Sequence, residues 1–108
     1  MVVKKIAKTR ENKVGKVFLC GEYRDIEFDM RRMLELEDEG ITINNMMEKY
    51  EANPLRTLID LAYVGTGKIF SKDKITDTAK AGDLILPVIG AFNKGSQSFV
   101  EDDVKKKS

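Results

Sequence analysis

Carboxylates are the most plentiful groups in this sequence that could take part in chemistry. Glu35, Glu37, Asp38 and Glu39 stand almost side by side. On a helix only Glu35 and Glu39 would share one side. The chain has no histidine, the commonest general base and metal ligand. Since no calcium-loop pattern or glycine-bounded pocket surrounds the acids, we expect no enzymatic activity, no catalytic residue, no metal site and no cofactor.

Two other features suggest sites but are better explained by local structure. Cys20 is the only cysteine and falls at a predicted hairpin turn, where nothing marks it as a reactive thiol. Gly65-Thr66-Gly67-Lys68 is reminiscent of a phosphate-binding loop, which needs a glycine five residues before its Gly-Lys pair and Ser or Thr after the lysine. Ala62 and Ile69 occupy those places. The loop is therefore expected to be a helix C-cap followed by a turn.

Methionines offer a different kind of site. Met30, Met33, Met46 and Met47 lie close together. Regular core packing explains them most simply. The alternative is an adaptable apolar surface, because methionine is flexible and polarisable and can repack around a partner. Under that alternative, the candidate partner-binding residues are Met46, Met47 and Tyr50.

Three short helices in a row are predicted to carry these side chains. The first opens at Asp29, a good N-cap, and is followed by Gly40. Its apolar stripe comprises Met30, Met33, Leu34 and Leu36.

The second helix is predicted to begin at Thr42, with Ile41 packing on Met46 as a hydrophobic staple. Its apolar residues, from Ile43 to Tyr50, repeat at i, i+3, i+4 and i+7. The third helix starts at Asn53-Pro54 and stops at Gly65.

On the N-terminal side, residues 14–28 read as a β-hairpin with its turn at Cys20-Gly21-Glu22. On the C-terminal side, residues 71–94 form either one helix kinked at Pro87 or two helices, the first capped by Ser71 or Thr76 and the second by Asp83. Gly95 is expected to end the last helix.

The fold class is therefore mainly α with an N-terminal β-hairpin (α+β), a small domain of four to five short helices. We expect a flexible segment over residues 1–13, one globular domain over 14–95 and a mobile tail over 96–108. The predicted buried side chains are Ile26, Phe28, Leu34, Leu58, Ile59, Ala62, Ile85, Ile89 and Phe92.

Composition narrows the partners. The chain has 108 residues, 19 basic and 18 acidic, for a net charge of +1. A protein built mainly to bind nucleic acid usually has a large excess of basic residues, so we expect no nucleic-acid partner. A local basic segment is nevertheless present at Lys4, Lys5, Lys8 and Arg10. The longest apolar run, Leu84 to Ala91, is too short to span a bilayer. One cysteine and no secretory signal favour the cytoplasm.

The order of these pieces carries a family resemblance. A hairpin ends in Tyr23-Arg24-Asp25-Ile26-Glu27-Phe28-Asp29-Met30-Arg31, and helices containing Met46-Met47-Glu48 and Leu55 to Tyr63 follow. Over roughly residues 16–92 this resembles the tail assembly chaperones of long-tailed (siphovirus-type) bacteriophages or prophages. The chain departs from that pattern at Pro87 and in the glycine-containing loop after residue 64.

The resemblance implies a non-enzymatic factor in the cytoplasm of the bacterial host. Such chaperones coat the tape measure protein and help to recruit tail tube subunits, so the expected partners are these two proteins. The methionine cluster separately suggests a face that binds either a helical segment of the tape measure protein or a second copy of the chain. In the resembled family a ribosomal frameshift often makes a longer product, and the lysine run 105–107 is where slippage would be sought. The alternatives left open are a small helical DNA-binding regulator and a structural tail or connector protein.

Overall fold

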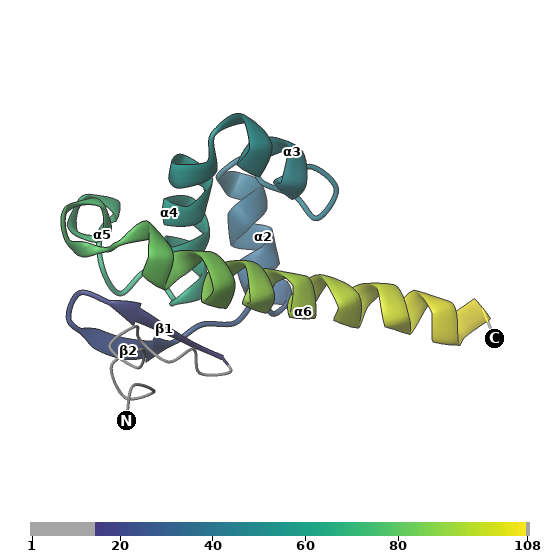
Figure 1. Ribbon diagram of the computed structural model, residues 1–108. Coiled ribbons are helices and arrows are strands. Elements are labelled where there is room, and N and C mark those ends of the chain that lie inside the picture. The colour runs from purple at the N-terminus through teal and green to yellow at the C-terminus, as the bar shows by residue number, and fades with distance from the viewer. Residues whose placement is uncertain (1–14, 108) are drawn as a thin grey trace, which may run out of the picture.

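The computed structural model describes the backbone of residues 15–107 and the side chains of residues 15–97. The predicted flexible segment 1–13 lies outside the described residues. Within them, the chain forms a two-stranded antiparallel hairpin followed by five helices (Figure 1). The predicted mainly helical α+β fold is thereby confirmed.

The hairpin comprises β1 (Lys16–Leu19) and β2 (Glu22–Asp25), with Leu19 opposite Glu22. Its turn is only two residues long, because Glu22 already belongs to β2. Cys20 and Gly21 both have positive φ angles, 50° and 89°, the geometry that matches the twist of tight hairpins. Val17 and Leu19 alternate with more exposed neighbours, so one face of the hairpin is buried against the helices.

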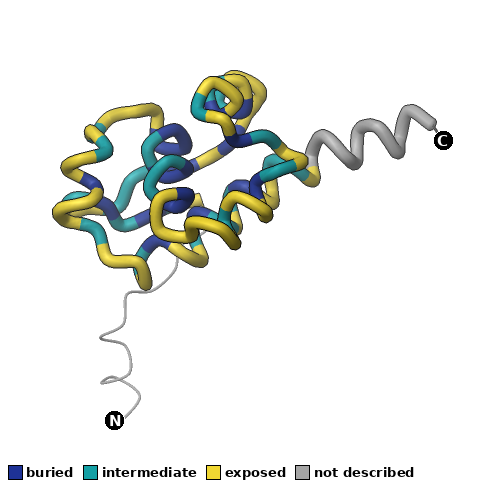
Figure 2. The backbone as a smooth tube through the Cα atoms, turned by 90° about the horizontal axis from the view of Figure 1, so that it is seen from above, coloured by how far each residue is buried: buried dark blue, intermediate teal, exposed yellow. Residues whose placement is uncertain are grey.

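The five helices are α2 (Met30–Asp38), α3 (Met46–Ala52), α4 (Pro54–Gly65), α5 (Lys72–Thr78) and α6 (Ala81–Lys107). In Figure 1, α6 runs across the front of the molecule, with α2 and α4 behind it and α3 above. α6 packs against both α4 and β1. The buried stretches in Figure 2 lie where these elements face one another, so the core is enclosed between α6, the hairpin and the α2–α4 layer.

Local capping signals explain most helix starts. Asp29 and Ser71 each accept a hydrogen bond from the backbone N–H three residues later, at 3.0 and 3.1 Å. α4 begins with Pro54 at its first position as predicted, although the Asn53 side chain makes no capping bond. α3 begins later than predicted, at Met46. Thr42 instead forms a turn with Asn45, in which each side-chain oxygen accepts the other's backbone N–H.

α6 corrects the predicted start and the predicted end of the last helix and decides between two alternatives that the sequence left open. It begins at Ala81 rather than after Asp83, so Pro87 lies inside the helix and not in its first turn. It is separate from α5, which answers the question of one helix or two over residues 71–94. It also continues through Gly95 to Lys107. The backbone of residues 96–107 is therefore helical, and the mobility expected of the 96–108 tail stays a prediction.

Gly95 has a packing role instead of a stop role. A Cβ atom there would lie 2.5 Å from the carbonyl oxygen of Phe28 and 3.0 Å from its Cβ. Gly65 lies close to the same residue, since a Cβ on it would be 2.7 Å from the Phe28 ring. Phe28 also meets Phe92 edge-on, with ring centroids 5.6 Å apart. The two glycines let α4 and α6 close around Phe28.

Most of the predicted core is confirmed, with two corrections. Ile26, Phe28, Leu58, Ala62 and Phe92 are buried, while Ile59 and Ile89 pack half-buried against the core. Leu34 and Ile85 were expected inside but are 55% and 38% exposed. On α2, Met33 and Leu36 are the buried side chains. Leu34 lies on a different side of the helix and therefore points away from the core. On α6 the core takes Leu84, Val88 and Phe92, and Ile85 lies at their edge.

Candidate functional site

The three predicted partner-binding residues occupy different environments. Met46 is 1% exposed and belongs to the core, so it cannot form part of a docking surface in the folded protein. Met47, one residue further along α3, is 54% exposed. Tyr50 is half-buried beside the core, one turn from both methionines. The simpler reading of the methionines thus holds for Met46, and the surface reading stays open for Met47 and Tyr50.

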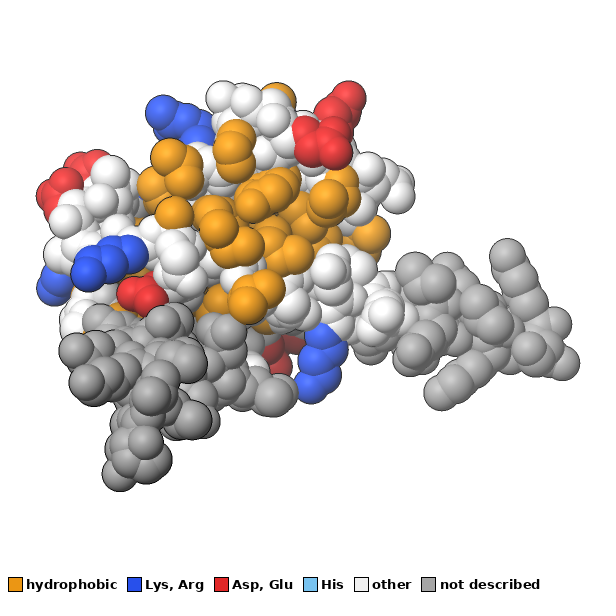
Figure 3. Space-filling view, viewed as in Figure 1, with side chains coloured by type: hydrophobic (Ala, Val, Ile, Leu, Met, Phe, Trp, Pro, Cys, Tyr) orange, Lys and Arg blue, Asp and Glu red, His pale blue; other side chains and the backbone are white. Residues whose placement is uncertain are grey.

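Met47 is one of several large hydrophobic side chains that the helices leave exposed. Figure 3 shows hydrophobic side chains gathered in one broad area over α2, α3 and α4, bordered below by α6. We call this surface the apolar face. We count as its large members the six large hydrophobic side chains that α2, α3, α4 and α6 leave exposed, by 38% to 65%: Met30, Leu34, Met47, Leu55, Ile85 and Leu86.

The size of the face is comparable with that of the largest apolar patch on a typical monomer. Burying a Leu, Ile or Met side chain completely removes about 60–120 Å² of apolar surface from water, at ~25 cal/mol per Å². Six side chains that are roughly half exposed leave on the order of 300 Å². Apolar patches of this size on monomers often mark interaction sites, whereas isolated exposed side chains need no explanation.

The face arises because the apolar stripes of the helices are wider than the core requires. On α2, Met33 and Leu36 enter the core, while Met30 and Leu34 form a second row spaced by four residues. Leu55 precedes the buried residues of α4 by less than one turn and is 62% exposed. Of these side chains, sequence reasoning named Met47 as a candidate partner-binding residue and Met30 as a member of the methionine cluster, but it expected Leu34 and Ile85 in the core. The missed signal was the surplus of apolar positions on α2.

Charged side chains of both signs border the apolar face. Arg31 lies three residues from Leu34 on α2, and Glu51 lies four residues from Met47 on α3, spacings that place each pair on one side of its helix. Both charged residues are exposed. Among the described side chains, no three His, Cys, Asp or Glu residues are grouped as a metal site would require. Its exposed apolar side chains and its border of mixed charge suit the face to binding an apolar partner.

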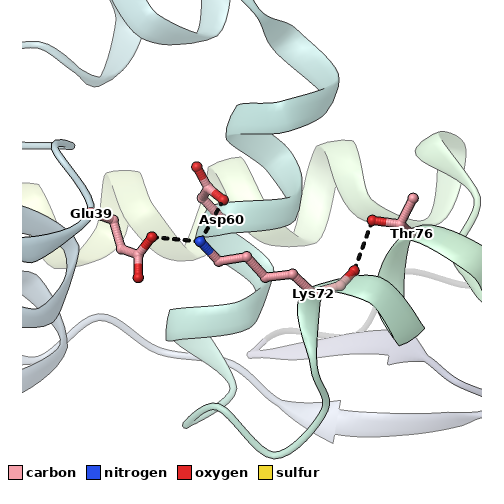
Figure 4. Close-up of polar contacts among 4 residues, drawn as sticks. All are labelled: Glu39, Asp60, Lys72 and Thr76. Carbon is pink, nitrogen blue, oxygen red and sulfur yellow. Dashed lines mark hydrogen bonds and ion pairs between the residues drawn. The ribbon is translucent and has the colours of Figure 1, made fainter.

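One ionic cluster joins three helices. Lys72, the first residue of α5, forms ion pairs with Glu39 at the end of α2 and, at 3.1 Å, with Asp60 of α4 (Figure 4). Its Nζ also lies 5.3 Å from the centre of the Tyr63 ring. The hydrogen bond with Glu39 raises the pKa of Lys72 above its ordinary value. Because Lys72 pairs with both carboxylates, the cluster acts as a structural tie and not as an acid–base pair.

The other two features considered in the sequence have structural roles. Cys20 accepts a hydrogen bond from the Thr78 hydroxyl at 3.4 Å, which joins the hairpin turn to α5. After α4, the glycine loop turns with positive φ at Gly67 and Lys68, and the Lys68 Nζ lies 5.8 Å from the Tyr63 ring centre. The expected C-cap and turn are confirmed.

None of the described helices is both long and apolar enough to cross a bilayer. Comparison with family models, with curated protein sequences and with solved structures finds no match to this chain.

Proposed function

We propose that this protein is a tail assembly chaperone of a long-tailed bacteriophage or prophage. In this role it binds helical segments of the tape measure protein in the host cytoplasm, before the tail tube forms, and helps to recruit tail tube subunits. It acts without catalysis. The observation that carries the proposal is the apolar face, whose exposed side chains come from four helices.

The chemistry of the face suits such a client. A long helical protein awaiting assembly exposes apolar stripes, and an amphipathic helix binds by laying its stripe against an apolar surface. Met30 and Met47, exposed by 60% and 54%, can change rotamer to fit successive segments of different sequence. The binding is expected to be modest for each segment, because a chaperone must later release its client to the tail tube.

The proposal is tested by co-expression with the tape measure protein encoded in the same phage or prophage genome. We expect Leu34→Glu and Met47→Glu each to weaken its capture at least about tenfold, because a desolvated carboxylate against an apolar stripe costs more than ~1.4 kcal/mol. Both side chains are more than half exposed, so the fold should survive, which circular dichroism will check.

Ile69→Glu is the matched control. Ile69 is 51% exposed, as large and apolar as the tested residues, but it lies in the loop after α4 rather than on the helices of the apolar face. Capture should be unchanged in this variant. Equal capture by wild-type protein, Leu34→Glu and Met47→Glu would contradict the proposal.

A further inference from the structure

The charged side chains beside the apolar face are unevenly distributed around it. We propose that the face selects amphipathic helices that carry lysine or arginine beside their apolar stripe, because the side of the face formed by α2 and α3 is acidic. This inference deepens the proposed function by naming the chemistry of the client segment. It rests on that function for the identity of the client, but not for the preference itself.

Three exposed carboxylates lie in line with the exposed apolar side chains of α2 and α3. On α2, Glu37 and Asp38 follow Leu34 by three and four residues. On α3, Glu51 follows Met47 by four residues. These spacings place each acid on the same side of its helix as the exposed apolar residue. A helix that covers the apolar side chains therefore brings its own flanking residues close to these acids.

Exposed cations offset this negative charge only in part. Arg31, three residues before Leu34, lies on the same side of α2. Lys49 is also exposed, but it follows Met47 by two residues and so lies on the opposite side of α3. Arg56 is the exposed cation of α4. Figure 3 shows acidic side chains at the upper right edge of the apolar face, over α3, and basic side chains at its upper left edge. The excess of acid is confined to the side of α2 and α3.

The charges of α2 oppose its helix dipole. Acids are favourable in the first turn of a helix and cations in the last, but α2 has neither. Instead, Arg31 and Arg32 stand in its first turn. Glu37 and Asp38 end the helix. Arg32 has a structural role, because its guanidinium donates a hydrogen bond to the Gly65 carbonyl at 2.8 Å. No comparable contact accounts for the two acids among the described residues.

The two acids at the end of α2 also have no cation of their own in the described part of the chain. Within residues 15–97, ion pairs involve four other carboxylates, those of Glu22, Asp25, Glu39 and Asp60. Exposed, unpaired charges that oppose the helix dipole lower the stability of the fold. A cationic partner explains acids at such places, next to exposed Leu34, because it would neutralise them on binding.

A client helix that suits this face has an apolar stripe flanked by cations. Its apolar side chains would cover Leu34 and Met47, as proposed above. Lysine and arginine beside the stripe have long apolar stems that can lie along the face while their charged ends reach the carboxylates at its edge. These charges are expected to decide which helices bind, more than how tightly an average helix binds.

The experiment compares two designed helical peptides of about 20 residues that share one leucine stripe. The first peptide carries lysine beside the stripe, and the second carries glutamate at the same positions. Fluorescence titration measures the binding of each peptide to the full-length protein. We expect the lysine peptide to bind at least about fivefold more tightly at low salt. The difference should shrink at about 1 M salt, where exposed charges are screened. Equal affinities at low salt, or tighter binding of the glutamate peptide, would overturn the inference.

The double variant Glu37→Lys/Asp38→Lys should reverse the preference between the two peptides. Its melting temperature, followed by circular dichroism, should rise by a few degrees, because the substitutions remove the conflict with the helix dipole. Asp73→Lys/Asp77→Lys is the matched control. It changes the net charge by the same amount at two exposed acids of α5, which is not a helix of the apolar face. The control should keep the wild-type preference. A Glu37→Lys/Asp38→Lys variant that keeps it too, or that melts below the wild type, would overturn the inference.

The outcomes separate this inference from the proposed function. If fragments of the tape measure protein bind but the two peptides bind equally, the proposed function stands and the preference fails. If the lysine peptide is preferred and the double variant reverses the preference, but no fragment is captured, the preference stands and the proposed function fails. The face would then serve a different basic helix.

Discussion

The side chain of Lys72 connects three helices of this fold. Its ammonium group joins Glu39 of the α2 C-terminus and Asp60 of α4 to the first turn of α5. Because its side chain is 37% exposed, solvent screens these pairs. We therefore expect Lys72→Met to lower the free energy of unfolding by only ~1 kcal/mol, measured by urea denaturation at neutral pH. Lys80→Met, at an exposed lysine just before α6, should have almost no effect.

The pH dependence of this effect follows from the direction of the pKa shift. The pKa of Lys72 is raised above its ordinary value of 10.5, chiefly by the hydrogen bond with Glu39. The charged form is therefore favoured in the folded state, and its contribution is fully present below pH 10.5. The difference between wild type and Lys72→Met should shrink as the pH rises through the folded-state pKa. A difference that grows above pH 10.5 would contradict this account.

The neighbouring methionines Met46 and Met47 show which properties of a residue can be predicted from the sequence and which cannot. The spacing of Met46, Met47 and Tyr50 correctly indicates a helix, but it does not say which side of the helix meets the core. Met46 proved to be core and Met47 surface, although the two are adjacent in sequence and alike in chemistry. The choice depends on where α4 lies against α3, which is a tertiary contact.

At the scale of helices, Gly95 and Gly90 make a matched pair within α6. A Cβ at Gly95 would lie 2.5 Å from the Phe28 carbonyl oxygen, whereas one at Gly90 meets nothing within 4 Å. In a helix interior, alanine is more favourable than glycine by about 1 kcal/mol. Gly90→Ala should therefore raise the melting temperature. Gly95→Ala should lower it, since the crowding costs ~1–3 kcal/mol. Two substitutions that both stabilise would show that α6 does not cross Phe28 so closely.

The start of α2 at Asp29 was predictable, because Asp29 caps the helix through a side-chain bond within the first turn. Ser71 caps α5 in the same way and is the correct one of the two candidates, Ser71 and Thr76. The start of α3 was not predicted correctly, because Thr42 forms a turn with Asn45 instead of capping the helix. Gly95 looks like a helix stop in sequence, yet its smallness serves a contact with Phe28, far away along the chain. The apolar stripe of α2 was likewise visible, but its division between core and surface was not.

For the whole molecule, the apolar face is the feature that a self-contained fold does not need. The core is already closed by residues such as Leu58, Leu61 and Val88, which are at most 1% exposed. Within the described part of the chain, the exposed apolar side chains of α2, α3, α4 and α6 are not needed to complete this core. A surface of this kind is best explained by a partner.

The most direct test of this account uses the methionines as probes of their own surroundings. Methionine methyl groups labelled with ¹³C give separate NMR signals for exposed Met30 and Met47 and for buried Met33 and Met46. On addition of a helical fragment of the tape measure protein, the account predicts that the Met30 and Met47 signals shift strongly. The Met33 and Met46 signals should stay close to their original positions. No change at Met30 and Met47, with the fragment demonstrably bound, would contradict the claim that the apolar face is the client site.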